Sequence, residues 1–98
     1  ISMLKIKENV DLKELEKFGF KKISEFYIRE YELKDKINYY KKHYIRIRNL
    51  PNYAYYKEIF DCAEDSLGFV HINYKHINLE EKIKDLIKAD LVEKVEDK

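Results

Sequence analysis

The stretch that decides the fold is YYKKHYIRIR, which occupies residues 39–48. Its second half alternates with a period of two, which is typical of a β-strand whose two faces meet different surroundings. One face carries His43, Ile45 and Ile47, and the other carries Tyr44, Arg46 and Arg48. Pro51-Asn52 follows. Because proline has no N–H to give to a neighbouring strand, we expect the strand to end there.

Runs rich in β-forming residues lie on both sides of this strand. We expect further strands at residues 26–33, 53–62 and 69–75, and a short one at residues 3–7. The polar segments KDK at residues 34–36 and EDSLG at residues 64–68 suit turns between them. Strands joined by such short loops are almost always antiparallel neighbours, so the middle of the chain should form an antiparallel sheet.

The segment after the first strand has the signals of a two-turn helix at residues 11–18. Asp11 can cap its first turn, and Glu14 stands three residues later, where it would complete a capping box. Gly19 occupies the position at which a left-handed residue ends a helix. We therefore expect a helix bounded by Asp11 and Gly19.

A second helix is expected near the C-terminal end. Asn78 can cap it, and Glu81 repeats the capping-box spacing. The apolar stripe at helical spacing consists of Leu79, Ile83, Leu86 and Ile87. This stripe predicts a helix over residues 79–89. Residues 91–95 suit either a continuation of the helix or a final strand, and the sequence leaves both open.

Together these elements predict an α+β fold. We expect an antiparallel sheet of about four or five strands with two helices on one of its faces, because so apolar a sheet needs burial. The order along the chain is β-α-β-β-β-β-α, with a short final strand as the open alternative. The domain should cover residues 3–98, with Met3 as a native start and Ile1-Ser2 as extra residues.

Composition limits the class of protein. The chain has 98 residues, of which 45% are hydrophobic and 40% charged, and this suits one folded domain. No apolar run reaches the length of a membrane span, and no signal peptide is evident at the N-terminus. The lone cysteine, Cys62, cannot form an internal disulfide, so the fold needs no oxidising compartment. We expect a cytoplasmic protein with no membrane partner.

Few residues suit catalysis or metal binding. The whole chain has only two glycines, so a glycine-rich phosphate-binding loop cannot form. Cys62 has His43, His71 and His76 as conceivable partners, but nothing in its context favours an activated thiolate, so we expect a small buried side chain. A zinc site made by two of the histidines with Cys62 or Asp61 would match no common ligand spacing. The sequence predicts a protein that is no enzyme and needs no cofactor or metal.

The most distinctive feature is a basic, tyrosine-rich middle. The net charge is only +1, yet residues 34–57 hold seven basic side chains against the single acid Asp35, and six of the nine tyrosines lie between residues 39 and 56. Tyrosine and arginine are enriched at binding hot spots, and the same mixture suits nucleic acid. The candidate contact residues are Tyr39, Tyr40, Lys41, Lys42, Tyr44, Arg46, Arg48, Tyr53 and Tyr55.

A structural explanation of the tyrosines carries about equal weight. Half of them would line the core, the rest would stand on a solvated face, and A-T-rich coding would account for the excess. The two explanations differ in where the rings lie, since a binding surface requires them on an exposed sheet face beside Arg46 and Arg48.

Two segments near the ends of the chain carry a family resemblance. They are LKIKENVDLKELEKFGF at residues 4–20 and DLIKADLVEKVE at residues 85–96. Both resemble the ends of small uncharacterised proteins from phages and prophages of low-GC Gram-positive bacteria, in which the ends look alike and the middle varies. The resemblance covers about a third of the chain and carries over no catalytic residue. It implies a phage-type protein that binds and blocks a host factor, as anti-defence proteins such as anti-CRISPR inhibitors do.

Three functions follow as hypotheses. The first is a non-enzymatic phage-type protein that binds and modulates a host protein or a protein–nucleic-acid complex in the host cytoplasm. The second is direct nucleic-acid binding through the basic tyrosine-rich stretch. The third is self-association, with the tyrosines in a homodimer interface.

Overall fold

The structure, a computed structural model, describes residues 2–33, 39–74 and 78–96. Its main element is a five-stranded antiparallel sheet in which each strand pairs with the next along the chain. The strands are β2 (Lys21–Ile23), β3 (Phe26–Tyr31), β4 (Lys42–Arg48), β5 (Ile59–Glu64) and β6 (Val70–Ile72). The expected α+β fold with an antiparallel sheet is thereby confirmed. The predicted turn at residues 34–36 lies outside the described residues.

The first and last strands form a separate two-stranded sheet. In it β1 (Ser2–Ile6) pairs antiparallel with β7 (Val92–Glu96), so that Leu4 lies opposite Lys94. The open question at residues 91–95 is thus resolved as a strand. The first strand does not join the five-stranded sheet, since outside β7 its only bridge among the described residues is an isolated one from Lys5 to Glu58.

The first helix, η1 (Leu12–Phe18), is a 3-10 helix over nearly the expected residues. The Asp11 side chain caps it by accepting a hydrogen bond from a backbone N–H of the first turn. Gly19 ends it with a φ of 84°, a left-handed conformation that glycine adopts without strain. The Glu14 carboxylate, however, pairs with the Lys17 ammonium at 3.0 Å and not with the backbone N–H of Asp11, so the predicted capping box does not form.

The second helix is interrupted. In place of one helix over residues 79–89, the chain forms α1 (Leu79–Lys82) and α2 (Lys84–Lys88), which are separated at Ile83, where φ of −120° and ψ of 26° are neither helical nor extended. Asn78 has a left-handed φ of 61° and its side chain makes no capping hydrogen bond, so the predicted cap is wrong. The predicted stripe packs into the core except for Ile87, which is 41% exposed.

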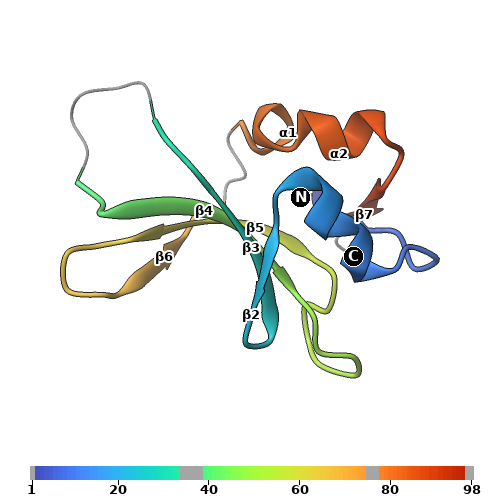
Figure 1. The fold of residues 1–98 in the computed structure, drawn as a ribbon, viewed down its shortest axis with the longest axis horizontal. Helices are drawn as coiled ribbons and strands as arrows, with labels where there is room; N and C mark the ends of the chain where they lie inside the picture. The colour runs from blue at the N-terminus through green and yellow to red at the C-terminus, as the bar shows by residue number, and fades with distance from the viewer. Residues whose placement is uncertain (1, 34–38, 75–77, 97–98) are drawn as a thin grey trace.

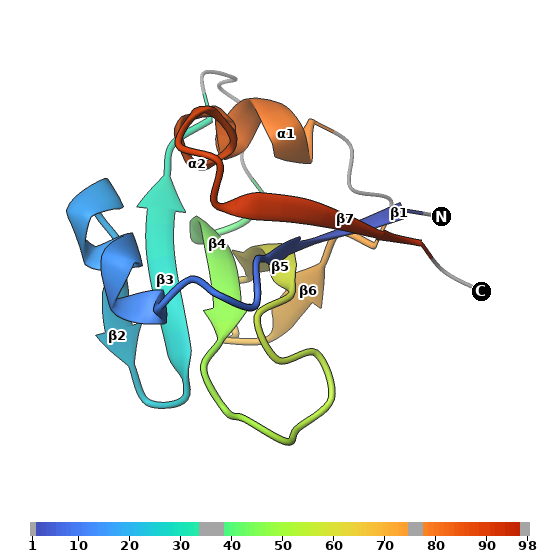
Figure 2. The ribbon, with the colours of Figure 1, turned by 90° about the vertical axis from the view of Figure 1, so that its right-hand side faces the viewer.

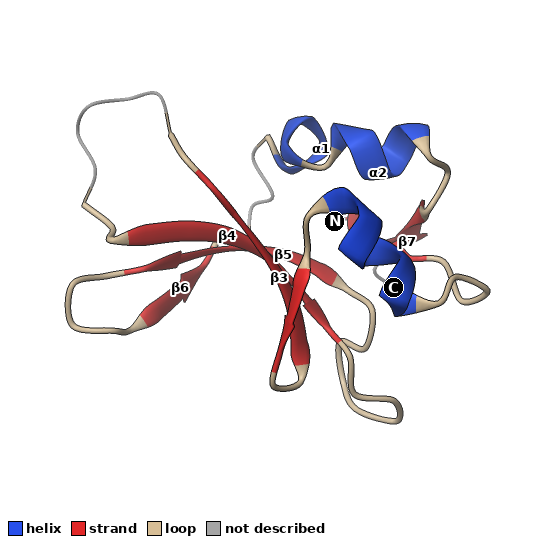
Figure 3. Cartoon of the chain, viewed as in Figure 1, coloured by secondary structure: helices blue, strands red, loops and turns tan. Residues whose placement is uncertain are grey.

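All of these smaller elements lie on one side of the main sheet. Figure 1 shows α1 and α2 along one side, and Figure 2 shows β1 and β7 crossing the same side of β4 and β5. The secondary-structure colouring of Figure 3 shows helices on this side only, among the described residues. The core between these layers comprises Leu4, Ile6, Leu12, Leu15, Phe20, Tyr27, Ile45, Ile47, Ile59, Leu79, Ile83 and Leu86. The opposite side of the sheet has no covering layer among the described residues.

Two polar clusters attach the helices to the sheet. The guanidinium of Arg29 on β3 donates to the Phe18 carbonyl and the Lys82 carbonyl, each at 2.9 Å, and to the Asp85 carboxylate at 2.7 Å. Lys82 on α1 in turn reaches Asp61 on β5 at 2.7 Å. These contacts fix the ends of η1, α1 and α2 on the inner face of the sheet.

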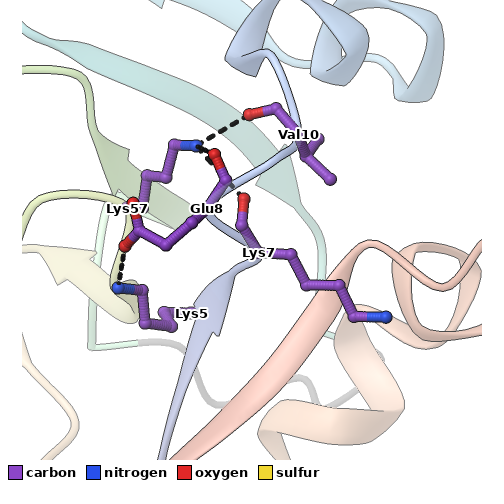
Figure 4. A network of polar contacts seen from close by, with 5 residues as sticks. All are labelled: Lys5, Lys7, Glu8, Val10 and Lys57. Carbon is purple, nitrogen blue, oxygen red and sulfur yellow. Dashed lines mark hydrogen bonds and ion pairs between the residues drawn. The ribbon is translucent and has the colours of Figure 1, made fainter.

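Lys57 joins the two sheets. Its backbone carbonyl accepts from the Ile6 N–H, and its Nζ lies within 3.1 Å of three carbonyl oxygens, those of Lys7, Glu8 and Val10. Figure 4 shows how these carbonyls converge on the ammonium from the loop after β1. Lys57 is only 4% exposed. Its charge is therefore buried and is compensated by main-chain dipoles.

Two expectations about strand boundaries need correction. Residues 53–58, expected to begin a strand, form a loop, and the backbone takes left-handed φ angles of 67° at Tyr55 and 66° at Lys57. Conversely, β2 (Lys21–Ile23) was not expected. It pairs with β3 through a tight turn in which Ser24 has a φ of 56°.

Candidate functional site

The candidate site is the uncovered side of the five-stranded sheet, which we call the open face. The alternation predicted for β4 is confirmed: His43, Ile45 and Ile47 turn toward the helices, and Tyr44, Arg46 and Arg48 turn to the open face. Strand register then decides their neighbours. Arg46 stands between Ile28 of β3 and Phe60 of β5, and Arg48 stands opposite Phe26.

The two arginines stack on aromatic rings. The guanidinium carbon of Arg46 lies 4.5 Å from the centroid of Phe26 and 6.0 Å from that of Phe60. That of Arg48 lies 5.2 Å from Phe26 and 5.1 Å from Tyr53. These distances are within cation–π range, so the rings hold both cations in fixed positions on the sheet.

Exposed rings surround this pair. Tyr55 and Tyr74 are 58% and 67% exposed, and each packs its ring edge-to-face with Phe60 at 5.7 Å and 6.4 Å. Together with the arginines they surround a hollow of about 160 Å³, lined by Phe26, Arg46, Arg48, Tyr55, Phe60, Ile72 and Tyr74. Rigid aromatic rings beside arginine are typical of binding hot spots.

Most charges on the open face are already paired. Lys42 lies 3.8 Å from Glu64, and Arg48 lies 3.9 Å from Glu25. The guanidinium of Arg46, by contrast, makes no hydrogen bond or ion pair with any described residue. The face therefore offers one uncompensated cation within an aromatic surface.

The centre of the open face is chemically inert. Cys62 is 1% exposed, and burial raises the pKa of its thiol to about 11, so the predicted small buried side chain is confirmed. Burial also raises the pKa of the neighbouring Tyr44 hydroxyl. Neither group is a nucleophile near neutral pH in these surroundings.

The structure divides the predicted contact residues between two sides. Those on or beside the open face are Lys42, Tyr44, Arg46, Arg48, Tyr53 and Tyr55. Of these, Tyr44 is only 6% exposed and packs in a cluster with Phe60 and Cys62, so it offers little surface to a partner. Tyr39 is 87% exposed, and Lys41 and Tyr40 lie toward the helix side, where Tyr40 packs against His43 and His71. Sequence reasoning missed Phe26 and Phe60, which only strand register brings to the arginines, and Tyr74, which follows β6 and packs on Phe60.

A second hollow, of about 370 Å³, lies on the helix side near α1. One of its lining residues is Asp61, which is 4% exposed and accepts hydrogen bonds from the Tyr31 hydroxyl at 2.5 Å and from Lys82 at 2.7 Å. Burial and the bond to Asp61 raise the pKa of Tyr31 far above its ordinary value. Because all three groups satisfy one another and join α1 to β5, this cluster has a structural role.

Metal ligands do not gather in the described part of the chain. No group of three His, Cys, Asp or Glu side chains is placed to hold a metal ion within residues 2–33, 39–74 and 78–96. His71 pairs with Asp65 of its own hairpin at 2.8 Å. His76, the other histidine of the conceivable zinc site, lies outside the described residues.

Comparisons with protein families, curated proteins and solved structures gave no match. No helix in the described segments is long and apolar enough to cross a membrane. The function must therefore be argued from the open face.

Proposed function

We propose that this protein binds another protein through the open face. The observation that supports this most directly is the position of Arg46 and Arg48, stacked among Phe26, Phe60 and the exposed Tyr55 on a sheet face that no described element covers. Exposed aromatic patches mark interaction sites in other proteins. Tyr44, Phe60 and Cys62 at the centre of this face are buried, but the rings around them are 57–67% exposed, where a partner can reach them: Tyr53, Tyr55 and Tyr74.

The charge pattern favours a protein partner over nucleic acid. A nucleic-acid surface works by neutralising several phosphates with free cations. On this face carboxylates lie 3.8 Å from Lys42 and 3.9 Å from Arg48 and partly compensate these cations, and Glu30 stands opposite Tyr44. One uncompensated arginine among aromatic rings is instead the composition of a protein–protein hot spot.

The setting we propose is a phage-type protein that modulates a host factor, including the anti-defence and anti-CRISPR-like role. This part rests on the resemblance of residues 4–20 and 85–96 to phage and prophage proteins. An inhibitor with a cationic hot spot would contact an acidic patch on its target, and it would not act as a DNA mimic.

A capture experiment tests the proposal. Immobilised protein would be exposed to cytoplasmic lysate of a low-GC Gram-positive bacterium, with an Arg46→Glu/Arg48→Glu double variant in parallel. The matched control is Lys84→Glu/Lys88→Glu, which reverses two exposed charges on α2, away from the open face. We expect a partner that binds the wild type and the control but is lost from the open-face variant. Equal capture by all three proteins contradicts the proposal.

Nucleic-acid binding is kept as a second candidate because Tyr53, Tyr55 and Tyr74 present exposed rings on which bases could stack. It predicts binding to single-stranded oligonucleotides that weakens steeply with salt. A protein partner predicts a shallower salt response.

A homodimer through the same rings is the third candidate. Light scattering across a concentration series tests it directly, since a constant monomer mass rejects self-association.

A further inference from the structure

The hollow on the open face contains a cation whose hydrogen-bonding capacity is unused. The guanidinium carbon of Arg46 lies over the Phe26 ring, 4.5 Å from its centroid. Among the described residues, none of the guanidinium N–H groups of Arg46 has an acceptor. An arginine held in this way is preorganised for a planar acceptor.

Arg48 adds to the positive potential of the same hollow. Its Nη1 donates to the Ala54 carbonyl at 3.2 Å, which holds the side chain in place. Its buried Nε has no hydrogen-bond partner and lies 3.9 Å from the nearer Glu25 oxygen, beyond hydrogen-bond distance. The carboxylate of Glu25 therefore only partly compensates the two stacked guanidinium groups.

The walls of the hollow are apolar. Phe60, Ile72 and the rings of Tyr55 and Tyr74 line it beside the arginines. Its volume of about 160 Å³ corresponds to roughly five water molecules at about 30 Å³ each in the liquid. This is room for one side chain, with its charged end at Arg46 and its apolar part against the rings.

We infer that the hollow receives a carboxylate side chain, Asp or Glu, from an acidic segment of the partner protein. This rests on the proposed function and names the chemistry of the partner's anchor residue. A carboxylate matches the forked edge of arginine in a bidentate pair. Displacing water from the aromatic walls strengthens that pair, because charges interact more strongly where water is excluded.

The inference can be tested on the isolated protein without knowledge of the partner. The probe is phenylacetate, which combines a carboxylate with one ring, and phenylacetamide is the uncharged control of the same shape. Titrations would follow the side-chain Nε–Hε signals of Arg46 and Arg48 by NMR. We expect saturable shifts with phenylacetate, with a dissociation constant on the order of a few millimolar, as for weak ligands of this size. We expect no saturable shift with phenylacetamide.

Variants separate this site from general charge attraction. Arg46→Gln should weaken phenylacetate binding at least tenfold, whereas Lys42→Gln, the same charge loss on the same strand face, should change it less than twofold. Arg46→Lys keeps the charge but lacks the forked N–H groups, so it should also weaken phenylacetate binding. This variant replaces Arg46→Gln in the test if the glutamine variant does not fold. Equal loss in the Lys42 variant, or no saturable shift with phenylacetate in the wild type, overturns the inference.

Inorganic phosphate is the third probe of the same titration. Tighter binding of phosphate than of phenylacetate would assign the hollow to a phosphate group and reject the carboxylate. These results are independent of the capture experiment. Loss of a partner from the open-face variant without any carboxylate binding would leave the proposed function standing and reject only the anchor.

Discussion

Replacing Lys57 by methionine should destabilise the protein strongly without changing the open face. Methionine has similar length but cannot donate the three hydrogen bonds from Nζ to the carbonyls of Lys7, Glu8 and Val10. Charge-assisted bonds contribute about 1.5–3 kcal/mol each, so three at the lower value give about 4.5 kcal/mol. Removing the ammonium also removes the cost of burying it, which offsets part of this loss. We expect a net loss of about 2–4 kcal/mol.

Urea unfolding followed by circular dichroism measures this change. A protein of this size has a free energy of unfolding of about 5–15 kcal/mol, so the expected loss should clearly lower the urea concentration at the midpoint of unfolding. Thermal melting should fall by roughly 10–25 °C. The control is Lys13→Met, since Lys13 is exposed on η1. This substitution should stay within about 0.5 kcal/mol of wild type.

Two outcomes would refute the reasoning. If Lys57→Met unfolds like Lys13→Met, the converging carbonyls contribute no net stability. If it is destabilised but hydrogen exchange of the Val10 amide is unchanged, the loss does not come from the loop after β1. That amide donates to the Lys7 carbonyl, one of the three acceptors of Nζ.

Three further substitutions or reactions test other buried groups. Glu58 is 7% exposed, its Oε2 lacks a hydrogen-bond partner among the described residues, and burial raises the pKa of its carboxyl. Folding therefore disfavours the charged form, so Glu58→Gln should raise the melting temperature at neutral pH. The gain should vanish below the ordinary glutamate pKa of 4.5; a gain that is independent of pH contradicts this cause. With a thiol pKa of about 11, only roughly one Cys62 in a thousand is ionised at pH 8. A disulfide reagent should thus label Cys62 only when the protein unfolds. Rapid labelling of the folded protein would show that the thiol is accessible to the reagent and would contradict this prediction. Asp61→Asn should cost about 2–3 kcal/mol, less than a fully buried pair, because the Lys82 side chain is 22% exposed. A double-mutant cycle with Lys82→Met should recover part of that loss, and strict additivity would show that the two groups are not coupled.

The sequence predicted the faces of β4 correctly because alternation is a local property. His43, Ile45 and Ile47 could be assigned to one face without knowledge of any neighbour. The same holds for the hairpin at residues 64–68, where Asp65 accepts from the backbone N–H groups of Leu67 and Phe69.

The errors arose where tertiary contacts override local preference. Residues 53–58 are rich in tyrosine and suit a strand, but the chain instead bends so that Lys57 reaches the loop after β1. The break at Ile83 separates two short helices that the apolar stripe alone would join. Neither feature has a signal in the local pattern.

Only part of the candidate site could be predicted, because tertiary contacts also decide which residues surround the arginines. Arg46 and Arg48 were identified from their own strand, but their ring partners come from β3 and β5. Phe26 and Phe60 reach the arginines only through register, which depends on the length and path of the connecting loops. Tyr40 and Lys41 were assigned to the surface from composition, which carries no information on which side they face.

The alternation along β4 also has an evolutionary consequence. Positions 45 and 47 must fill a fixed core, and the buried Tyr44 packs in a smaller cluster on the open face, whereas positions 42, 46 and 48 are freer to change. Relatives that meet different targets should therefore diverge at these three positions and stay constant at the buried ones. A single inserted or deleted residue would exchange the two sets, so adaptation here should proceed by substitution and hardly ever by a change of length.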